Sequence, residues 1–209
     1  ASALADFDIV VAMRERTRFS RNLIEHLPRL RMIALTGGRT WTMDFDALNA
    51  RAIPVCHTGG THSTAATSEL ALGLLLAAAR RIPAADVSMR TGRFQGGVPV
   101  GEVLEGKTLG VVGLGKIGTK MARYGQALGM RVLAWSENLT ADKAAAAGAQ
   151  RVEKAVLLAE SDAVSLHLVL SERTRGILGA ADLDRMKAGA ILVNTSRGPL
   201  VDEVALLAK

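Results

Sequence analysis

Short aliphatic runs alternate with longer segments of helical periodicity along the chain. Each aliphatic run is too short to be a lone helix, and the alternation is typical of a parallel sheet covered by helices. The predicted strands cover residues 7–12, 31–35, 53–56, 108–112, 131–135, 163–168 and 190–194. The predicted helices include residues 20–27, 44–50, 69–82 and 117–128. The pattern therefore predicts an α/β protein.

The polar, glycine-bearing segment 58–67 interrupts this pattern. We place a domain boundary in this segment, which divides residues 1–63 from residues 64–209. Pro83 is expected to close or kink the helix that follows, because proline lacks the backbone N–H that a helix interior uses.

Capping residues support the expected order of elements in the second domain. Gly129 and Gly148 stand where a left-handed C-cap is needed, since glycine adopts positive φ without strain. Thr140 and Asp202 stand where a side chain that accepts a hydrogen bond is needed at a helix N-terminus.

The segment 69–82 is apolar on every side of the expected helix. Its longest apolar run covers the ten residues 70–79, about half of what a membrane span needs. A helix that is apolar all round must be covered all round, which exceeds what one sheet face supplies. We therefore expect this helix to contribute to a homodimer interface, and we expect no membrane partner.

Composition narrows the class of protein. Of the 209 residues, 49% are hydrophobic and 22% are charged, which excludes a disordered or fibrous chain. Only 3% are aromatic, so the core is expected to be aliphatic. The formal charge of +6 is spread along the chain without interleaved aromatic residues, so we expect an anionic small molecule and no nucleic acid as partner. The single cysteine, Cys56, and the lack of a leader pattern favour the cytoplasm.

The sequence Gly113-Leu114-Gly115-Lys116-Ile117-Gly118 has the spacing G-x-G-x-x-G. It follows a predicted strand and opens a predicted helix, which is the context that this motif requires. The first glycine permits a tight turn, the second lets the backbone approach a pyrophosphate, and the third lets the helix pack close to the strand. The free amides of the helix start then face the anion. The motif predicts a dinucleotide site.

An acidic residue that binds the adenosine ribose is expected about 20 positions beyond the glycines. The next strand ends in Trp135, Ser136 and Glu137, so serine stands where aspartate is expected. Serine does not repel a 2′-phosphate, whereas Glu137 is able to bind the ribose hydroxyls. The sequence favours NAD slightly and leaves NADP open.

Three ordered segments resemble one family. Residues 106–118 resemble the cofactor motif of the D-isomer-specific 2-hydroxyacid dehydrogenases, residues 166–176 their second cofactor loop, and residues 193–203 their arginine signature. The resemblance covers nearly the whole chain and is strongest to phosphoglycerate dehydrogenase-like members. It implies a Rossmann-type doubly wound parallel sheet, the NAD(P)-binding domain of residues 64–209. Residues 1–63 would then be part of a smaller, flavodoxin-like α/β substrate domain.

The resemblance implies hydride transfer between NAD(P) and C2 of a small D-2-hydroxy acid or 2-keto acid. Arg197, just past a predicted strand, is the catalytic candidate: its planar guanidinium would hold the substrate carboxylate and polarise the carbonyl. The adjacent glycines Gly37 and Gly38 resemble a loop whose backbone amides hold that carboxylate. Val169 replaces the family's proline, so the second cofactor loop is expected to be less rigid. The implied cofactor contacts are Gly113, Gly115, Lys116, Ile117, Gly118, Ser136, Leu168, Thr174, Thr195 and Ser196.

The family reaction uses a histidine acid/base and an orienting glutamate, both located after the arginine. Only 12 residues follow Arg197 up to Lys209, so the sequence is expected to be an internal fragment that does not turn over by itself. The alternative is a dinucleotide-sensing regulator or corepressor of the same fold, for which no general acid is needed. The spacing of Cys56, His57 and His62 fits no standard zinc motif, and we expect no metal.

Overall fold

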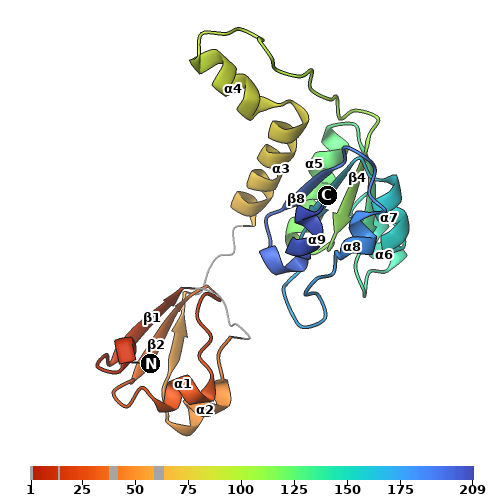
Figure 1. The fold of residues 1–209 in the computed structure, drawn as a ribbon. Helices are drawn as coiled ribbons and strands as arrows, with labels where there is room; N and C mark the ends of the chain where they lie inside the picture. Colours follow the sequence, from red (N-terminus) through yellow and green to blue (C-terminus); the bar gives the residue numbers. More distant parts are fainter. Residues whose placement is uncertain (1, 14, 38–41, 59–63) are drawn as a thin grey trace. The chain divides into compact units, whose positions relative to one another are not determined.

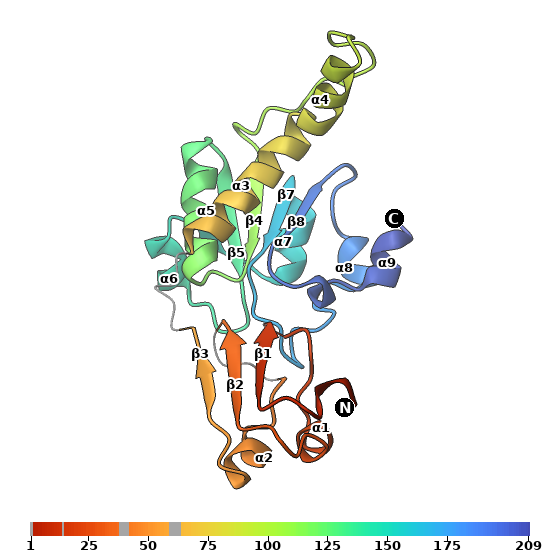
Figure 2. The same cartoon turned by 90° about the vertical axis from the view of Figure 1, so that its left-hand side faces the viewer.

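The computed structural model describes residues 2–13, 15–37, 42–58 and 64–209. The chain divides into two compact units, Ala1–Ser63 and Thr64–Lys209. Figures 1 and 2 show that each unit contains its own sheet, with helices packed on it. Each unit is described separately below.

The first unit is a three-stranded parallel sheet in the order β1-β2-β3. The strands are β1 (Ile9–Met13), β2 (Met32–Thr36) and β3 (Val55–His57), joined by helices α1 (Arg21–Glu25) and α2 (Phe45–Ala50), and a short 3-10 helix, η1 (Ser2–Leu4), precedes them. Alternate strand residues such as Val10 and Ile33 are buried, and they belong to one core with Ile24 and Leu48 of the two helices. The opposite face of β1 is exposed, with Val11 at 70%.

The second unit is a five-stranded parallel sheet in the order β6-β5-β4-β7-β8. Its strands are β4 (Thr108–Val112), β5 (Arg131–Trp135), β6 (Gln150–Arg151), β7 (Ala163–Leu166) and β8 (Ile191–Asn194). Its helices are α3 (Ala65–Ala79), α4 (Ile82–Arg90), α5 (Lys116–Ala127), α6 (Ala141–Ala146), α7 (Lys154–Glu160), α8 (Ala180–Leu183) and α9 (Glu203–Leu207), with a 3-10 helix η2 (Gly198–Leu200). The central strand β4 is buried along its whole length.

Helices cover both faces of this sheet. Alternate residues of β4 point to opposite faces, so each contacts a different set of helices. Val111 belongs to a core with Leu75 of α3 and Met121 of α5. Val112 belongs to a second core with Leu157 of α7. The predicted Rossmann-type α/β fold is confirmed, and strands 108–112 and 131–135 have the predicted bounds.

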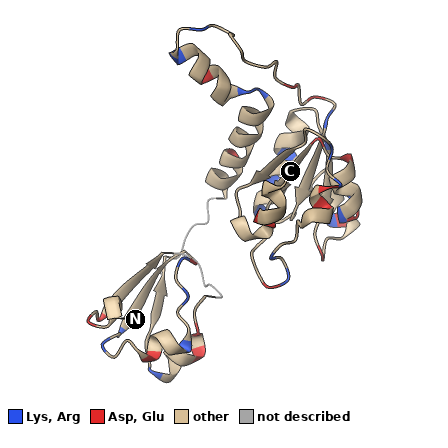
Figure 3. Cartoon of the chain, in the orientation of Figure 1, with Lys and Arg blue, Asp and Glu red and all other residues tan. Residues whose placement is uncertain are grey.

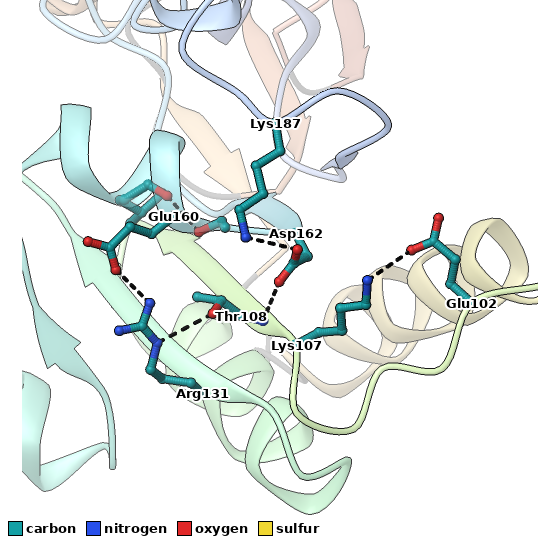
Figure 4. A network of polar contacts seen from close by, with 9 residues as sticks. Glu102, Lys107, Thr108, Arg131, Glu160, Asp162 and Lys187 are labelled. Atoms are coloured by element: carbon teal, nitrogen blue, oxygen red, sulfur yellow. Dashed lines mark hydrogen bonds and ion pairs between the residues drawn. The ribbon is translucent and has the colours of Figure 1, made fainter.

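A polar network fixes the amino ends of β4, β5 and β7 (Figure 4). Asp162 accepts hydrogen bonds of 2.8 Å from the Thr108 amide and 2.9 Å from Lys187, while Arg131 pairs with Glu160 at 2.5 Å. Burial by itself would raise the pKa of Asp162, but these hydrogen bonds lower it by a larger amount, so the pKa lies below the ordinary value of 3.8. The carboxylate is therefore stabilised as the anion. The network lies at the opposite strand ends from the glycine motif.

The helix that follows the first unit departs from the prediction. Helix α3 ends at Ala79, Arg81 adopts a left-handed φ of 56°, and a second helix begins at Ile82. Pro83 thus lies in the first turn of α4, where its missing N–H costs nothing, instead of closing a longer helix. In Figures 1 and 2, α4 extends beyond the end of the sheet. The predicted caps are present, with Gly129 and Gly148 at positive φ and the Thr140 and Asp202 side chains accepting from helix amides.

Candidate functional site

The turn between β4 and α5 contains the three glycines of the motif. Gly113 has a φ of 98°, which glycine adopts without strain. A Cβ at Gly113 would lie 2.8 Å from the carbonyl group of His167. A Cβ at Gly118 would overlap the carbonyl oxygen of Gly113. Neither position accommodates a side chain, so both glycines are needed for the turn itself.

Gly115 differs from these two glycines. A Cβ at Gly115 would meet no protein atom within 4 Å, so the packing of the described residues does not require glycine here. The residue is the N-cap of α5, and its extended backbone offers no side chain to the helix amides. A glycine beside open space at a helix N-terminus fits a position that a phosphate approaches closely. The turn therefore fits the pyrophosphate of a dinucleotide.

The neighbouring strands hold this turn from both sides. The Gly113 amide donates to the Trp135 carbonyl at the end of β5, at 2.8 Å, and the His167 amide donates to the Val112 carbonyl at the end of β4, also at 2.8 Å. The carboxyl ends of β5, β4 and β7 therefore meet at the glycine turn. Open parallel sheets bind their ligands at the carboxyl ends of the strands, at the point where the strand order reverses. Here that point is β4, which has β5 on one side and β7 on the other.

Two buried polar atoms near this edge lack a partner among the described residues. They are Nδ1 of His167 and Oγ1 of Thr195, which directly follow β7 and β8. The other ring nitrogen of His167 lies 2.8 Å from Oγ of Ser165. Burial lowers the pKa of His167 to about 4, so the ring is neutral at pH 7. Thr195 was expected to contact the cofactor, and an unsatisfied buried hydroxyl is suited to that role.

Asn194, the last residue of β8, organises the segment that carries Arg197. Its side-chain amide donates to the Arg197 carbonyl at 2.8 Å, and its side-chain oxygen accepts from the Ser196 amide at 3.1 Å. Ser196 in turn donates its hydroxyl to the Leu166 carbonyl at 2.9 Å. Arg197 is half-buried, and its guanidinium donates to the Ser196 carbonyl at 2.9 Å. The arginine thus follows a segment that is braced against β7.

A cavity of about 350 Å³ lies beside the ends of β5 and β7. We call it the Trp135 cavity. Leu168 and Thr174, both predicted cofactor contacts, line this cavity. Ser136, also a predicted contact, is half-buried and lies in the sequence between two lining residues, Trp135 and Glu137. The Thr174 hydroxyl donates to the Val169 carbonyl at 2.7 Å and accepts from the Ser171 amide at 2.8 Å, so it ties the loop together. The cavity's other lining residues are Trp135, Glu137, Arg173 and Ile177.

The remaining predicted contacts lie in two places, the start of α5 and the first unit. Lys116 is exposed and Ile117 is half-buried in the first turn of α5. In the first unit, Gly37 has a φ of 117° and its amide donates to Oγ1 of Thr58 at 3.0 Å. Gly38 lies outside the described residues. A carboxylate bound at Gly37 would compete with the Thr58 hydroxyl for that amide.

Sequence reasoning missed the hydrogen bonds that Asn194 makes to residues 196 and 197, the Ser165–His167 pair and Arg173 of the Trp135 cavity, whereas Glu137 was a predicted ligand of the ribose hydroxyls. The Asn194 signal was present, because asparagine commonly accepts from the amide two residues later in a turn. The cavity as a whole had no such signal, since its residues come from the end of β5 and from the loops that follow β5 and β7.

Within the described residues, no group of three or more histidine, cysteine, aspartate or glutamate side chains is placed to hold a metal ion. No helix in that part of the chain has the length and hydrophobicity to cross a membrane. Figure 3 shows lysine and arginine interspersed with aspartate and glutamate in both units, so the positive charge is not confined to one element.

Three known proteins illustrate what the chain is similar to. A glyoxylate reductase from Thermococcus litoralis is 39% identical over 197 residues, 91% of this chain and 59% of that protein. The crystal structure of a phosphoglycerate oxidoreductase from Vibrio cholerae O395 has a TM-score of 0.88 and 38% identity, over 99% of this chain and 66% of that one. A D-lactate dehydrogenase from Aquifex aeolicus, crystallised with NAD and lactic acid, has a TM-score of 0.82 and 27% identity, over 99% and 62%.

The chain spans between 37% and 63% of the length of the first curated relatives compared. Residues 72–209 match the family model described as the NAD binding domain of D-isomer specific 2-hydroxyacid dehydrogenases. That match covers more than half of the chain, and it includes the glycine turn, the Trp135 cavity and Arg197. The chain therefore belongs to the D-isomer specific 2-hydroxyacid dehydrogenase family.

Proposed function

We propose that the protein of which this chain is a part transfers a hydride between NAD and C2 of a small D-2-hydroxy acid or 2-keto acid. The observation that carries the proposal is the open space at Gly115, at the start of α5, in a domain that matches the family's NAD-binding model. The names of the relatives favour small 2-keto or 2-hydroxy acids, since they include a glyoxylate reductase and a D-lactate dehydrogenase. They also favour an enzyme over a dinucleotide-sensing regulator.

The dinucleotide would supply the hydride acceptor or donor, and residues of this chain would hold it. The amides at the start of α5 would bind the pyrophosphate, because the N-cap Gly115 offers them no side chain. The Thr195 hydroxyl and Nδ1 of His167 are buried polar groups at the same edge of the sheet, with bonding capacity left for the cofactor or for water. Leu168 and Trp135 give the adjacent cavity apolar walls, as a nucleoside requires.

Arg197 would bind and polarise the acid. Its side chain lies past the carboxyl end of β8, and the planar fork of a guanidinium matches a carboxylate. Developing negative charge on the substrate oxygen would be stabilised by the same group. His167 is not suited to move the proton, because a general acid or base works best with a pKa near the working pH, and burial lowers the pKa of His167 to about 4. The proton-transfer histidine is expected after Arg197 in the full-length protein.

A substitution at Gly115 tests the cofactor site without disturbing the fold. We expect Gly115→Val to keep the unfolding midpoint of the full-length protein and to weaken NADH binding by at least about tenfold, because the new side chain would occupy the space of the pyrophosphate. Isothermal titration calorimetry with NADH measures the change. Gly179→Val is the matched control, since Gly179 is likewise a helix N-cap, that of α8, and a Cβ there would meet only the Gly176 carbonyl oxygen, at an ordinary contact distance of 3.9 Å. Equal NADH affinity in the Gly115 variant and the wild type would contradict the proposal.

We further propose that the protein is a homodimer, with the segment from α3 through residue 103 at its interface. Large apolar side chains are exposed along this segment, among them Leu70 at 57%, Val87 at 60% and Phe94 at 76%. A second copy is the favoured occupant, because a symmetric pair of such segments would cover the apolar side chains of both.

Oligomeric state tests this interface directly. We expect Val87→Asp to convert the dimer to a monomer in sedimentation velocity at micromolar concentration, because burying an unpaired carboxylate is unfavourable. Val204→Asp is the control, since Val204 is 81% exposed on α9, outside the proposed interface. A wild-type monomer, or a dimer that tolerates Val87→Asp, would refute the assignment.

A further inference from the structure

The Trp135 cavity contains two side chains of opposite charge. Glu137 lies on the loop after β5, and Arg173 lies on the loop after β7. Both are exposed, and neither forms an ion pair with another of the described residues. A bound molecule in this cavity therefore meets one anionic and one cationic group.

The position after β5 at which dinucleotide-binding folds usually carry a carboxylate is occupied here by a serine. Ser136 directly follows the last residue of β5, where an acidic residue commonly binds the ribose 2′-hydroxyl and repels a 2′-phosphate. Serine is neutral and small, so it leaves room and imposes no repulsion. The next residue in the sequence, Glu137, carries a carboxylate and is exposed.

The loop of Arg173 is held in place by its neighbour. The Thr174 hydroxyl bonds to the Val169 carbonyl at 2.7 Å, to the Ser171 amide at 2.8 Å and to the Ser171 hydroxyl at 3.1 Å. These bonds close the loop on itself and fix the backbone from which Arg173 projects. Because the backbone is already fixed, ordering the Arg173 side chain on an anion costs less entropy than it would on a mobile loop.

The other nearby cations are already engaged. Lys154 lies 5.9 Å from the centre of the Trp135 ring, but its ammonium group is bonded to Asp182 and to the Ile177 carbonyl, both at 2.9 Å. Arg151 pairs with Glu153 at 3.0 Å and donates to the Leu139 carbonyl at 2.9 Å. Arg173 is the cation that lines the cavity without such a partner among the described residues.

We propose that Arg173 binds the 2′-phosphate of NADP, so that the protein accepts NADP as well as NAD, and that Glu137 limits the preference for NADP by opposing the same phosphate. A guanidinium binds phosphate oxygens through charge-assisted hydrogen bonds, whereas the unphosphorylated ribose offers it no anion. This inference rests on the proposed cofactor site. It assigns the selectivity of that site between NAD and NADP to Arg173 and Glu137.

The test compares the dissociation constants of NADH and NADPH for the full-length protein by isothermal titration calorimetry. We expect Arg173→Ala to weaken NADPH binding by about tenfold and to change NADH binding by less than about twofold. We expect Glu137→Gln to strengthen NADPH binding by about threefold, because a repulsive charge is removed. NADH binding by each variant also reports that the site is folded.

Arg175→Ala is the matched control. Arg175 is exposed two residues along the same loop and lines a different cavity, so its loss makes the same change in net charge without touching the Trp135 cavity. We expect it to leave the ratio of the two dissociation constants within about twofold of the wild-type ratio. The proposal is overturned if Arg173→Ala leaves that ratio unchanged, if Arg175→Ala shifts it equally, or if the wild type binds NADH but not NADPH. A wild type that binds neither dinucleotide overturns the proposed function itself.

Discussion

Replacing Arg197 by alanine in the full-length protein is expected to lower kcat by about 10³-fold, while NADH affinity and the unfolding midpoint stay close to the wild-type values. The guanidinium is the group proposed to hold the substrate carboxylate and to stabilise charge on the oxygen that receives or releases the proton. Its removal would take away an interaction that strengthens in the transition state. Arg197→Lys keeps the charge but loses the planar fork, so most of the loss should persist.

The measurement is steady-state turnover with NADH and a panel of 2-keto acids that includes glyoxylate and pyruvate, together with thermal unfolding and NADH titration of each variant. Arg185→Ala is the control, since the Arg185 side chain is exposed and donates to the Ala181 carbonyl at 2.7 Å, beside α8. Full turnover in a folded Arg197→Ala enzyme would remove Arg197 from the reaction. A simultaneous loss of folding would instead give Arg197 a structural role.

The placement of Arg197 was predictable from sequence because a simple rule governs it. The residues that follow the strands of a parallel sheet lie at one edge, so a strand that ends at Asn194 places Arg197 at the same edge of the sheet as the glycine turn. The strands themselves were predictable where both faces are covered. Every residue of β4 is buried, and its bounds coincide with the aliphatic run in the sequence.

Other features were not predictable for equally physical reasons. Helix α4 was missed because a proline ends a helix or begins one, and only the left-handed backbone of Arg81 decides between the two. The last two predicted residues of the strand 163–168 leave the ladder, and His167 turns to Ser165 instead. The Trp135 cavity depends on side chains from two loops, whose meeting is a property of the fold and not of any local pattern.

Acidification from pH 7 to pH 4 is expected to destabilise the unit that contains His167 by about 3 kcal/mol through this residue alone. The pKa of His167 is about 4 in the folded chain, because burial disfavours the charged ring, and is near its ordinary value of 6.5 when the chain is unfolded. Between these two values the unfolded state binds a proton that the folded state does not bind. The free energy of unfolding therefore falls as the pH falls through this window, and the contribution of His167 is complete below pH 4.

The measurement is urea unfolding at several pH values, followed through Trp135, which lies in the same unit, with Trp41 replaced by phenylalanine. His167→Gln is the informative variant, since its amide is able to retain the bond to Ser165 and does not titrate. We expect the stability difference between the wild type and this variant to change by about 3 kcal/mol between pH 7 and pH 4. Asp162, whose pKa is lowered from 3.8, acts below that window and is common to both proteins. A difference that is constant with pH would show that the imidazole takes up a proton as readily in the folded chain as in the unfolded one, and that its burial does not keep it neutral.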